Sequence, residues 1–255
     1  MCLIFISHQN HPDYKLIVAG NRDEFYNRTT AAAAFWNDSP GVLAGRDLEA
    51  GGTWMGVNKR GKVSMLTNYR DPGNIDPNAP SRGALVSDFL TGDVSSEMYI
   101  DDVASDGGRY NGFNLLARDS KDLYYYSNYG KGVEKLAPGF YGISNKLLDS
   151  PWPKVIRGKQ RIGPAMAKVS PDVDEILDLL CDNEKAPLDQ LPETGLTKDR
   201  ELALSPMFIK TDNYGSRCST VVLIDKNDNV TFSERVYEPE TFRHSSNIFR
   251  FKAEQ

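Results

Sequence analysis

The 255-residue sequence contains few cysteines and few histidines, three of each type. Cys2, Cys181 and Cys218 are sparse and odd in number, which argues against a disulfide framework and favours a reducing compartment, the cytosol. No Cys-x-x-Cys or His-x-x-x-His spacing occurs, so we expect no metal site and no cofactor. His8 and His11 are three residues apart in an expected turn, where either a solvated loop or a metal or heme contact would explain them.

Long apolar runs and runs of basic residues are also missing. No stretch approaches the roughly 20 apolar residues that a membrane-spanning helix needs, so we expect no stable membrane insertion. The short apolar start has no basic leader and does not resemble a signal peptide. The formal net charge of −5, without a cluster of Lys and Arg, argues against a nucleic-acid partner.

The composition is that of an ordinary globular protein. Hydrophobic residues make up 40% of the chain and charged residues 25%, so a substantial core is expected. The length suits one large domain or two small ones, and we predict a single domain over residues 1–255.

The order of expected elements is strands, helices, strands, helices, strands. Strands are predicted by short apolar runs between turn residues, at 3–6, 16–19, 41–44, 53–58, 62–68, 113–117, 123–127, 140–144, 220–224, 230–236 and 248–251. Helices are predicted by apolar periodicity, at 81–91, 98–104, 152–169 with a break at 163–164, and 171–180. Residues 31–34 are expected to form a surface or helical turn and residues 185–200 a loop. Because many strands are sequence neighbours, the sheets should be largely antiparallel, with helices outside two stacked sheets.

The first 24 residues form an expected β-hairpin that places polar groups beside Cys2. If the turn centres near His11, opposed residue numbers sum to about 22. Cys2 would then lie opposite Gly20, with a cluster of polar residues just beyond the strand, Asn21, Arg22, Asp23 and Glu24. This cluster could be a solvated turn or part of a site.

Cys2 can be interpreted in two ways. It could simply begin a buried strand as a small hydrophobic residue. Alternatively, removal of Met1 would expose an α-amine, whose reference pKa of about 7.7 to 8.0 lets it act as general base for the thiol of the same residue. Arg22 would favour the thiolate, and Asp23 could hold the amine.

Three later polar segments, at 67–69, 144–146 and 216–219, each lie at the end of an expected strand. Asparagine at such a position, as at Asn68 and Asn145, can donate its amide to an oxyanion, although it is also a common turn former. Arg217 precedes an expected buried strand and could support the nucleophile or bind a substrate carboxylate. We expect Cys218 to be structural.

These motifs together resemble the NRDE family, whose named animal member is the transport and Golgi organisation protein 2. The likeness rests on segments in the same order along nearly the whole chain, at 1–6, 21–28, 51–56, 67–69, 110–115, 139–145, 151–152, 215–217 and 230–235. That family is similar to N-terminal nucleophile hydrolases of the penicillin V acylase and bile-salt hydrolase type. The resemblance implies an α+β fold, a four-layer αββα sandwich with two stacked, mainly antiparallel sheets.

The resemblance also implies roles for individual residues. Cys2 would be nucleophile and base, supported by Arg22 and Asp23, with Asn145 as oxyanion donor and Arg217 as a stabilising cation. Asn68 is a further possible donor, and Asn21 belongs with the substrate-binding residues. The implied activity is an amidohydrolase that cleaves a non-peptide C–N bond of a small acylated substrate. The alternative is a non-catalytic trafficking or binding protein that carries heme or an acyl-lipid ligand on the same fold.

Overall fold

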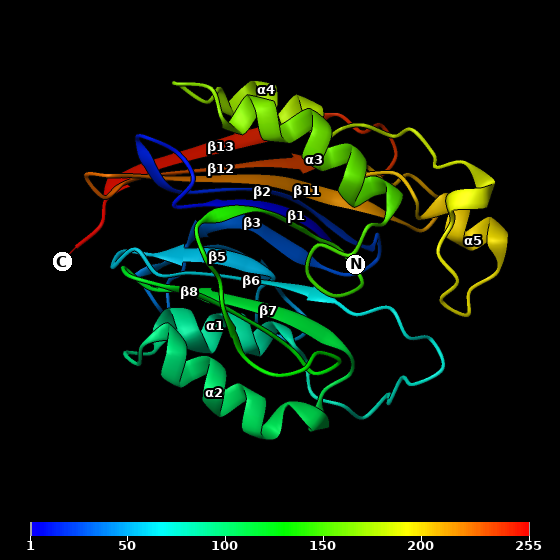
Figure 1. Ribbon diagram of the computed structural model, residues 1–255, viewed down its shortest axis with the longest axis horizontal. Coiled ribbons are helices and arrows are strands. Elements are labelled where there is room, and N and C mark those ends of the chain that lie inside the picture. Colours follow the sequence, from blue (N-terminus) through cyan, green and yellow to red (C-terminus); the bar gives the residue numbers. More distant parts are fainter. Residues whose placement is uncertain (1, 255) are drawn as a thin grey trace.

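A computed structural model describes residues 2–254, which form two stacked antiparallel β-sheets with helices on both outer faces (Figure 1). Sheet A has the order β10-β1-β2-β11-β12-β13, and sheet B has the order β3-β4-β5-β6-β7-β8-β9. Helices α3 and α4 cover sheet A, and α1 and α2 cover sheet B. The predicted αββα sandwich is therefore confirmed.

The bounds of the elements are as follows. The strands of sheet A are β1 (Cys2–His8), β2 (Tyr14–Phe25), β10 (Gly139–Ile143), β11 (Tyr214–Asp225), β12 (Asn229–Tyr237) and β13 (His244–Lys252). Those of sheet B are β3 (Thr30–Phe35), β4 (Val42–Asp47), β5 (Met55–Asn58), β6 (Val63–Asn68), β7 (Phe113–Arg118), β8 (Leu123–Ser127) and β9 (Glu134–Lys135). The helices are α1 (Gly83–Thr91), α2 (Ser96–Asp106), α3 (Pro153–Met166), α4 (Val173–Leu179) and α5 (Lys198–Ala203), with short 3-10 turns η1 (Gly107–Arg109) and η2 (Leu188–Gln190).

Strand β1 shows why an apolar run without alternation lies at the centre of the molecule. Cys2, Ile4 and Ile6 belong to the core between the two sheets. Leu3 and Phe5 point the other way and pack under α3 and α4. Because successive side chains of a strand point to opposite faces, a strand that is covered on both faces needs apolar residues at every position.

Two expectations about local structure are wrong. Residues 31–34 do not form a turn but lie in β3, whose backbone pairs with β4 from Thr30 to Phe35 across a bulge. Helix α3 is not broken at Pro164 but continues to Met166. Ile162, Ala165 and Met166 are buried under sheet A, and we attribute the continuation to that burial, which offsets the backbone hydrogen bond that proline cannot make.

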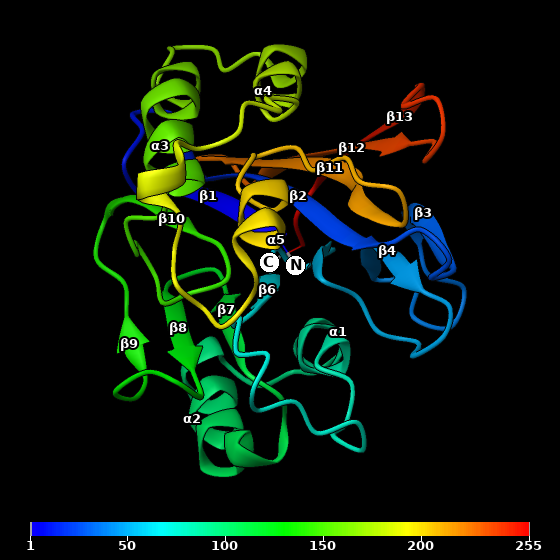
Figure 2. The ribbon, with the colours of Figure 1, turned by 90° about the vertical axis from the view of Figure 1, so that its right-hand side faces the viewer.

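The segment 185–200 was expected to be a loop, but it contains η2 and the start of α5. Helix α5 lies at one end of the sandwich, on neither outer face, as the two perpendicular views show (Figure 1 and Figure 2). An ion pair between Glu201 of α5 and Arg70, which follows β6, holds the helix against the end where the polar ends of β2 and β6 lie.

Within residues 2–254, no helix is long and apolar enough to cross a bilayer.

Candidate active site between the sheets

The β1–β2 hairpin brings Cys2 directly opposite Arg22. The predicted register is wrong: the numbers of paired residues sum to 24 and not to 22. The hairpin is symmetric about residue 12 and not about His11, and the amide of Gln9 donates to the carbonyl of Lys15 at 2.9 Å. Gly20 consequently lies opposite Ile4. The thiol is thus closer to the arginine than the predicted register placed it.

The polar cluster from Asn21 to Glu24 is not a turn after the strand but part of β2. The strand continues to Phe25 because β11 pairs with it on the other side as far as Tyr214. Strand alternation then sends neighbouring side chains to opposite faces. Arg22 and Glu24 share the face of Cys2, between the sheets, whereas Asn21 points toward the helices.

A cavity of about 380 Å³ opens between the two sheets at this end of the molecule. Cys2 lines it, together with Cys218 and apolar groups such as Trp54 and Leu66. The charged residues of its wall are five arginines and four acids, Arg22, Arg28, Arg46, Arg82, Arg217, Asp23, Glu24, Asp47 and Glu234. The cavity therefore combines a thiol with a strongly polar wall.

Cys2 is buried, with 7% of its surface exposed. Burial raises the pKa of its thiol, the charge of Asp23 raises it further, and Arg22 opposes the shift. The carbonyl of Cys2 accepts a hydrogen bond from the Ser144 hydroxyl at 3.0 Å. The backbone of the residue is thus fixed, and its side chain is a protonated thiol near neutral pH that would need a base to react.

Asp23 is buried and held from behind by β11. Its Oδ1 accepts a hydrogen bond of 2.6 Å from the Ser216 hydroxyl, which itself accepts the amide of Ile209 at 3.0 Å. Burial raises the pKa of Asp23, and the positive charge of Lys154 counteracts that rise. Because the Ser216 oxygen already accepts a backbone N–H, its proton is directed at the carboxylate.

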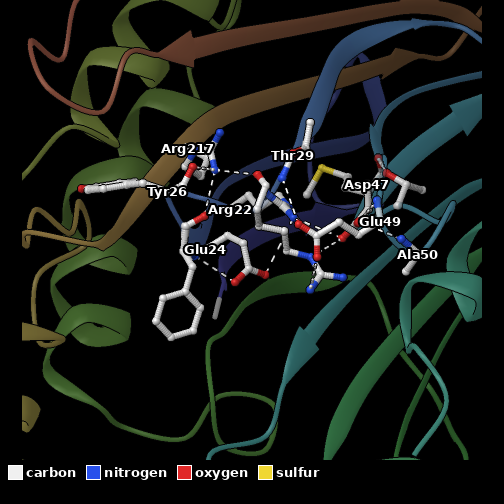
Figure 3. Close-up of polar contacts among 12 residues, drawn as sticks. Arg22, Glu24, Tyr26, Thr29, Asp47, Glu49, Ala50 and Arg217 are labelled. Carbon is white, nitrogen blue, oxygen red and sulfur yellow. Dashed lines mark hydrogen bonds and ion pairs between the residues drawn. The ribbon is translucent and has the colours of Figure 1, made fainter.

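Arg22 lies between two carboxylates without a close hydrogen bond to either. Its Nη2 is 3.8 Å from Glu24 and 3.7 Å from Asp47 (Figure 3). Asp47 is engaged more tightly by Arg28, whose Nε is 2.6 Å from it. The Nη1 of Arg22 is buried and has no hydrogen-bond partner within residues 2–254. The guanidinium therefore retains donors for a further group.

Arg217 occupies a β-bulge in β11, where the register with β2 shifts between Ser216 and Cys218. A bulge re-aims a side chain that regular alternation would send elsewhere. The Nη1 of Arg217 donates to the carbonyl oxygens of Phe25, Tyr26 and Arg28 (Figure 3). Arg217 thus fixes the segment after β2 and still lines the cavity.

The three asparagines singled out by sequence lie in different places. Asn68 lines the cavity. Asn145 is fully buried behind it, and its Nδ2 donates to the carbonyl of Asn68 at 2.9 Å. Asn21 faces the helices, where Nδ2 donates to the carbonyls of Leu180 and Met207 and Oδ1 accepts from Ser219. Of the three, only Asn68 lines the cavity.

Sequence reasoning missed several residues of the cavity. Arg82 precedes α1, and Glu234 lies on β12, where its Oε2 accepts the amide of Ala33 at 2.6 Å. Cys218, expected to be structural, also lies opposite Arg22, on the other side of β2 from Cys2. The alternation of β12 and the register of β11 could have indicated the last two, but no local motif marks Arg82.

His8 and His11 lie at the far end of the same hairpin. The ring of His11 is used on both sides: Nε2 is 2.8 Å from the carbonyl of Lys168, and Nδ1 accepts the amide of Asp13 at 3.0 Å. His8 is buried, and burial lowers its pKa to about 4. The two hydrogen bonds of the His11 ring hold the loop between β1 and β2 in place.

Comparison with known proteins gives consistent matches. The family model described as Transport and Golgi organisation 2 matches residues 1–239. The Transport and Golgi organization 2 homolog of Mus musculus is 40% identical over 98% of this chain and 99% of its own length. The Drosophila melanogaster Transport and Golgi organization protein 2 is 32% identical over 92% of this chain and 91% of its own.

One solved structure shows the likeness of fold. It is the Caenorhabditis elegans ortholog of N-acylethanolamine-hydrolyzing acid amidase, which superposes with a TM-score of 0.51 over 87% of this chain and 92% of its own. Its sequence identity is 11%. The likeness therefore concerns the fold alone, and it agrees with the predicted sandwich of two stacked sheets.

Proposed function

The chain belongs to the transport and Golgi organisation 2 family, and from its fold and cavity we propose that it is an N-terminal nucleophile amidohydrolase. The proposed reaction is cleavage of a non-peptide C–N bond in a small acylated molecule, with Cys2 as the nucleophile. The observation that carries the proposal is the direct pairing of Cys2 with Arg22 on the face that lines the cavity. The three cysteines are unpaired thiols, and we infer the reducing cytosol as its location.

The proposed mechanism begins with removal of Met1, a step that lies outside the described residues. The freed α-amine of Cys2 takes the thiol proton, and Sγ attacks the carbonyl carbon to form a tetrahedral oxyanion. The C–N bond then breaks, the ammonium returns its proton to the leaving amine, and a thioester remains on Sγ. Water attacks the thioester, its proton passes through the amine to the departing thiolate, and the carboxylic acid is released.

The residues around Cys2 each support one step of this mechanism. Arg22 favours the thiolate by its charge. Asp23, whose carboxylate is oriented by the Ser216 hydroxyl, holds the α-amine. We assign the oxyanion to Asn68, since preorganised donors stabilise charge that develops in the transition state. Asn145 holds the backbone of Asn68, and Arg217 supports the segment after β2. A buried thiol with a raised pKa needs a base, which is why the free amine is central.

The test uses the chain with Met1 removed, verified by intact mass, and an N-acylethanolamine or a fatty-acyl p-nitroanilide as substrate. We expect an acyl adduct on Cys2 and loss of at least 1000-fold in turnover for Cys2→Ala, as is usual when a catalytic nucleophile is deleted. Cys218→Ala is the matched thiol control, and this variant should still form the acyl adduct on Cys2.

A second control separates the amine from the thiol. A chain with two residues added before Cys2 keeps the thiol but has no α-amine there, and we expect it to be as inactive as Cys2→Ala. Equal turnover by the extended and the processed chain would rule out the N-terminal mechanism. Equal turnover by Cys2→Ala would rule out the nucleophile itself.

A further inference from the structure

We propose that the ligand of the cavity carries an anionic group, a carboxylate or a phosphate, which binds to Arg82, with Arg22 and Arg217 completing a cationic wall. The inference rests on the proposed function only in placing the reacting carbonyl at Cys2. It adds the chemical class of the ligand.

The ion pairs of the cavity wall are the first argument. Two of its five arginines are neutralised at close range: Arg28 by Asp47 at 2.6 Å and Arg46 by Asp38 at 2.7 Å. Within residues 2–254, neither Arg82 nor Arg217 has a carboxylate oxygen within 4 Å. A partly buried cation without a carboxylate at close range is costly, so the cavity has positive charge to offer a ligand.

The hydrogen bonds of these arginines are the second argument. Arg82 donates from Nη1 to the carbonyl of Gly112 at 2.9 Å, and Arg217 also donates from Nη1 alone. A guanidinium has five N–H donors in a fork that matches a carboxylate or phosphate in two-point contact. Since Nη1 of Arg22 is buried and has no partner in the described part of the chain, all three arginines keep donors for an anion.

The start of α1 adds to this wall. Ser81, Arg82 and Gly83 line the cavity, and α1 begins there with no side-chain cap and no acidic residue in its first turn. Helix N-termini favour negative charge. The position is enforced by close packing: a Cβ on Gly52 would lie 2.4 Å from the backbone of Gly83. Only glycine at residue 52 lets the helix start approach the cavity.

Among the described residues, the acids of the wall form no ion pair within 4 Å with Arg82 or Arg217, and Glu24 acts on both arginines only from a longer distance. Glu234 is buried, burial raises its pKa, and its Oε2 is bound to the amide of Ala33. Glu24 is 3.8 Å from Arg22 and accepts the amide of Phe25 at 2.9 Å. The spare N–H donors of the arginines make the cavity suited to an anion, while Trp54 and Leu66 supply an apolar wall for an acyl chain.

The experiment compares ligands that differ only in the head group, octanoate, octyl phosphate and octanol, by calorimetric binding to the Cys2→Ala chain. We expect at least one anion to bind tenfold tighter than octanol and to weaken as salt rises from 50 to 300 mM. Arg82→Gln should remove most of that preference, and Arg82→Lys should keep at least a third of the affinity. Preference for octyl phosphate would identify a phosphate ester as the ligand source, and preference for octanoate a free carboxylate.

Arg109→Gln is the charge-matched control, because Arg109 is an exposed partner of Asp106 outside the cavity. Equal binding of octanol and both anions would overturn the proposal, and so would equal losses in Arg82→Gln and Arg109→Gln. Circular dichroism melts check that the variants fold. Since Cys2→Ala cannot form a thioester, anion preference in this chain combined with an inactive processed enzyme would refute the hydrolase and leave the anion site standing.

Discussion

The two faces of β2 between Asn21 and Glu24 differ sharply in how well their polar groups are satisfied. On the helix side, Asn21 makes three buried hydrogen bonds. On the cavity side, Arg22 has, among residues 2–254, only ion pairs beyond 3.6 Å and one buried nitrogen without a partner. Residues that are adjacent in sequence therefore serve different purposes.

The difference indicates that one face of the motif contributes stability and the other offers chemistry. A buried polar group with all its hydrogen bonds stabilises the fold and is costly to remove. A group with donors to spare contributes little to the fold but can bind a ligand or tune a neighbour. Three predictions test this contrast, from the largest effect to the smallest.

Asn21→Ala should lower the free energy of unfolding by about 3 kcal/mol, since it leaves the carbonyls of Leu180 and Met207 and the Ser219 hydroxyl without their partner. Urea unfolding at pH 7.5 measures it. Asn247→Ala, at an exposed position of β13, is the control and should cost less than about 0.5 kcal/mol. A cost for Asn21→Ala no larger than that of the control would show that the helix face is not the stabilising one.

Lys154, which counteracts the pKa rise of Asp23 from the helix side, should give the protein a pH-dependent stability. Burial lowers the pKa of Lys154 to about 8, below its usual value, so between pH 8 and about 10.5 the unfolded chain binds more protons than the folded one. Stability due to this group therefore rises with pH in that window. Relative to Lys154→Met, the wild-type protein should gain about 2 kcal/mol between pH 7.5 and 9.5.

Guanidinium unfolding of both chains at the two pH values measures this gain, and the Lys154→Met chain corrects for all other titrating groups. If the difference in free energy of unfolding between the two chains were the same at both pH values, the pKa of Lys154 would not be lowered by burial.

Arg22→Gln should slow the alkylation of Cys2 by iodoacetamide about tenfold at pH 7.5, because the charge that favours the thiolate is lost. The free energy of unfolding should change by less than about 0.5 kcal/mol, as expected for loose ion pairs. Peptide mass spectrometry follows Cys2 separately from Cys218. Arg28→Gln removes a charge from the same wall that Asp47 already neutralises, and it should change the rate less than threefold. Equal slowing in both variants would mean that the effect is one of general charge and not of the Cys2–Arg22 pairing.

Much of the fold could be predicted because it depends on local patterns. Unbroken apolar runs identified β1 and the central part of β2, and the resemblance supplied the four layers. The register could not be predicted to the residue, since the hairpin loop contains no two-residue turn signature and its centre depends on how Gln9 and Lys15 bond.

The cavity was harder to predict because its residues come from distant parts of the chain. Arg22 was found because it follows an apolar run in a motif that the β1–β2 hairpin brings next to Cys2. Arg82 was missed because it reaches the cavity only through the approach of α1 to Gly52. Asn145 follows β10, but whether such a residue lines a cavity or lies behind Asn68 depends on packing between the two sheets.

The position of β2 between β1 and β11 has one more consequence. Cys2 and Cys218 both lie opposite Arg22, one on each side, so their backbones are two strand spacings, about 10 Å, apart. A disulfide needs Cα atoms within about 7 Å. Oxidation therefore cannot join the two thiols and close the cavity, whereas a reagent with two electrophilic ends about that far apart could bridge them. The sheet acts as a built-in spacer that keeps the thiols separate.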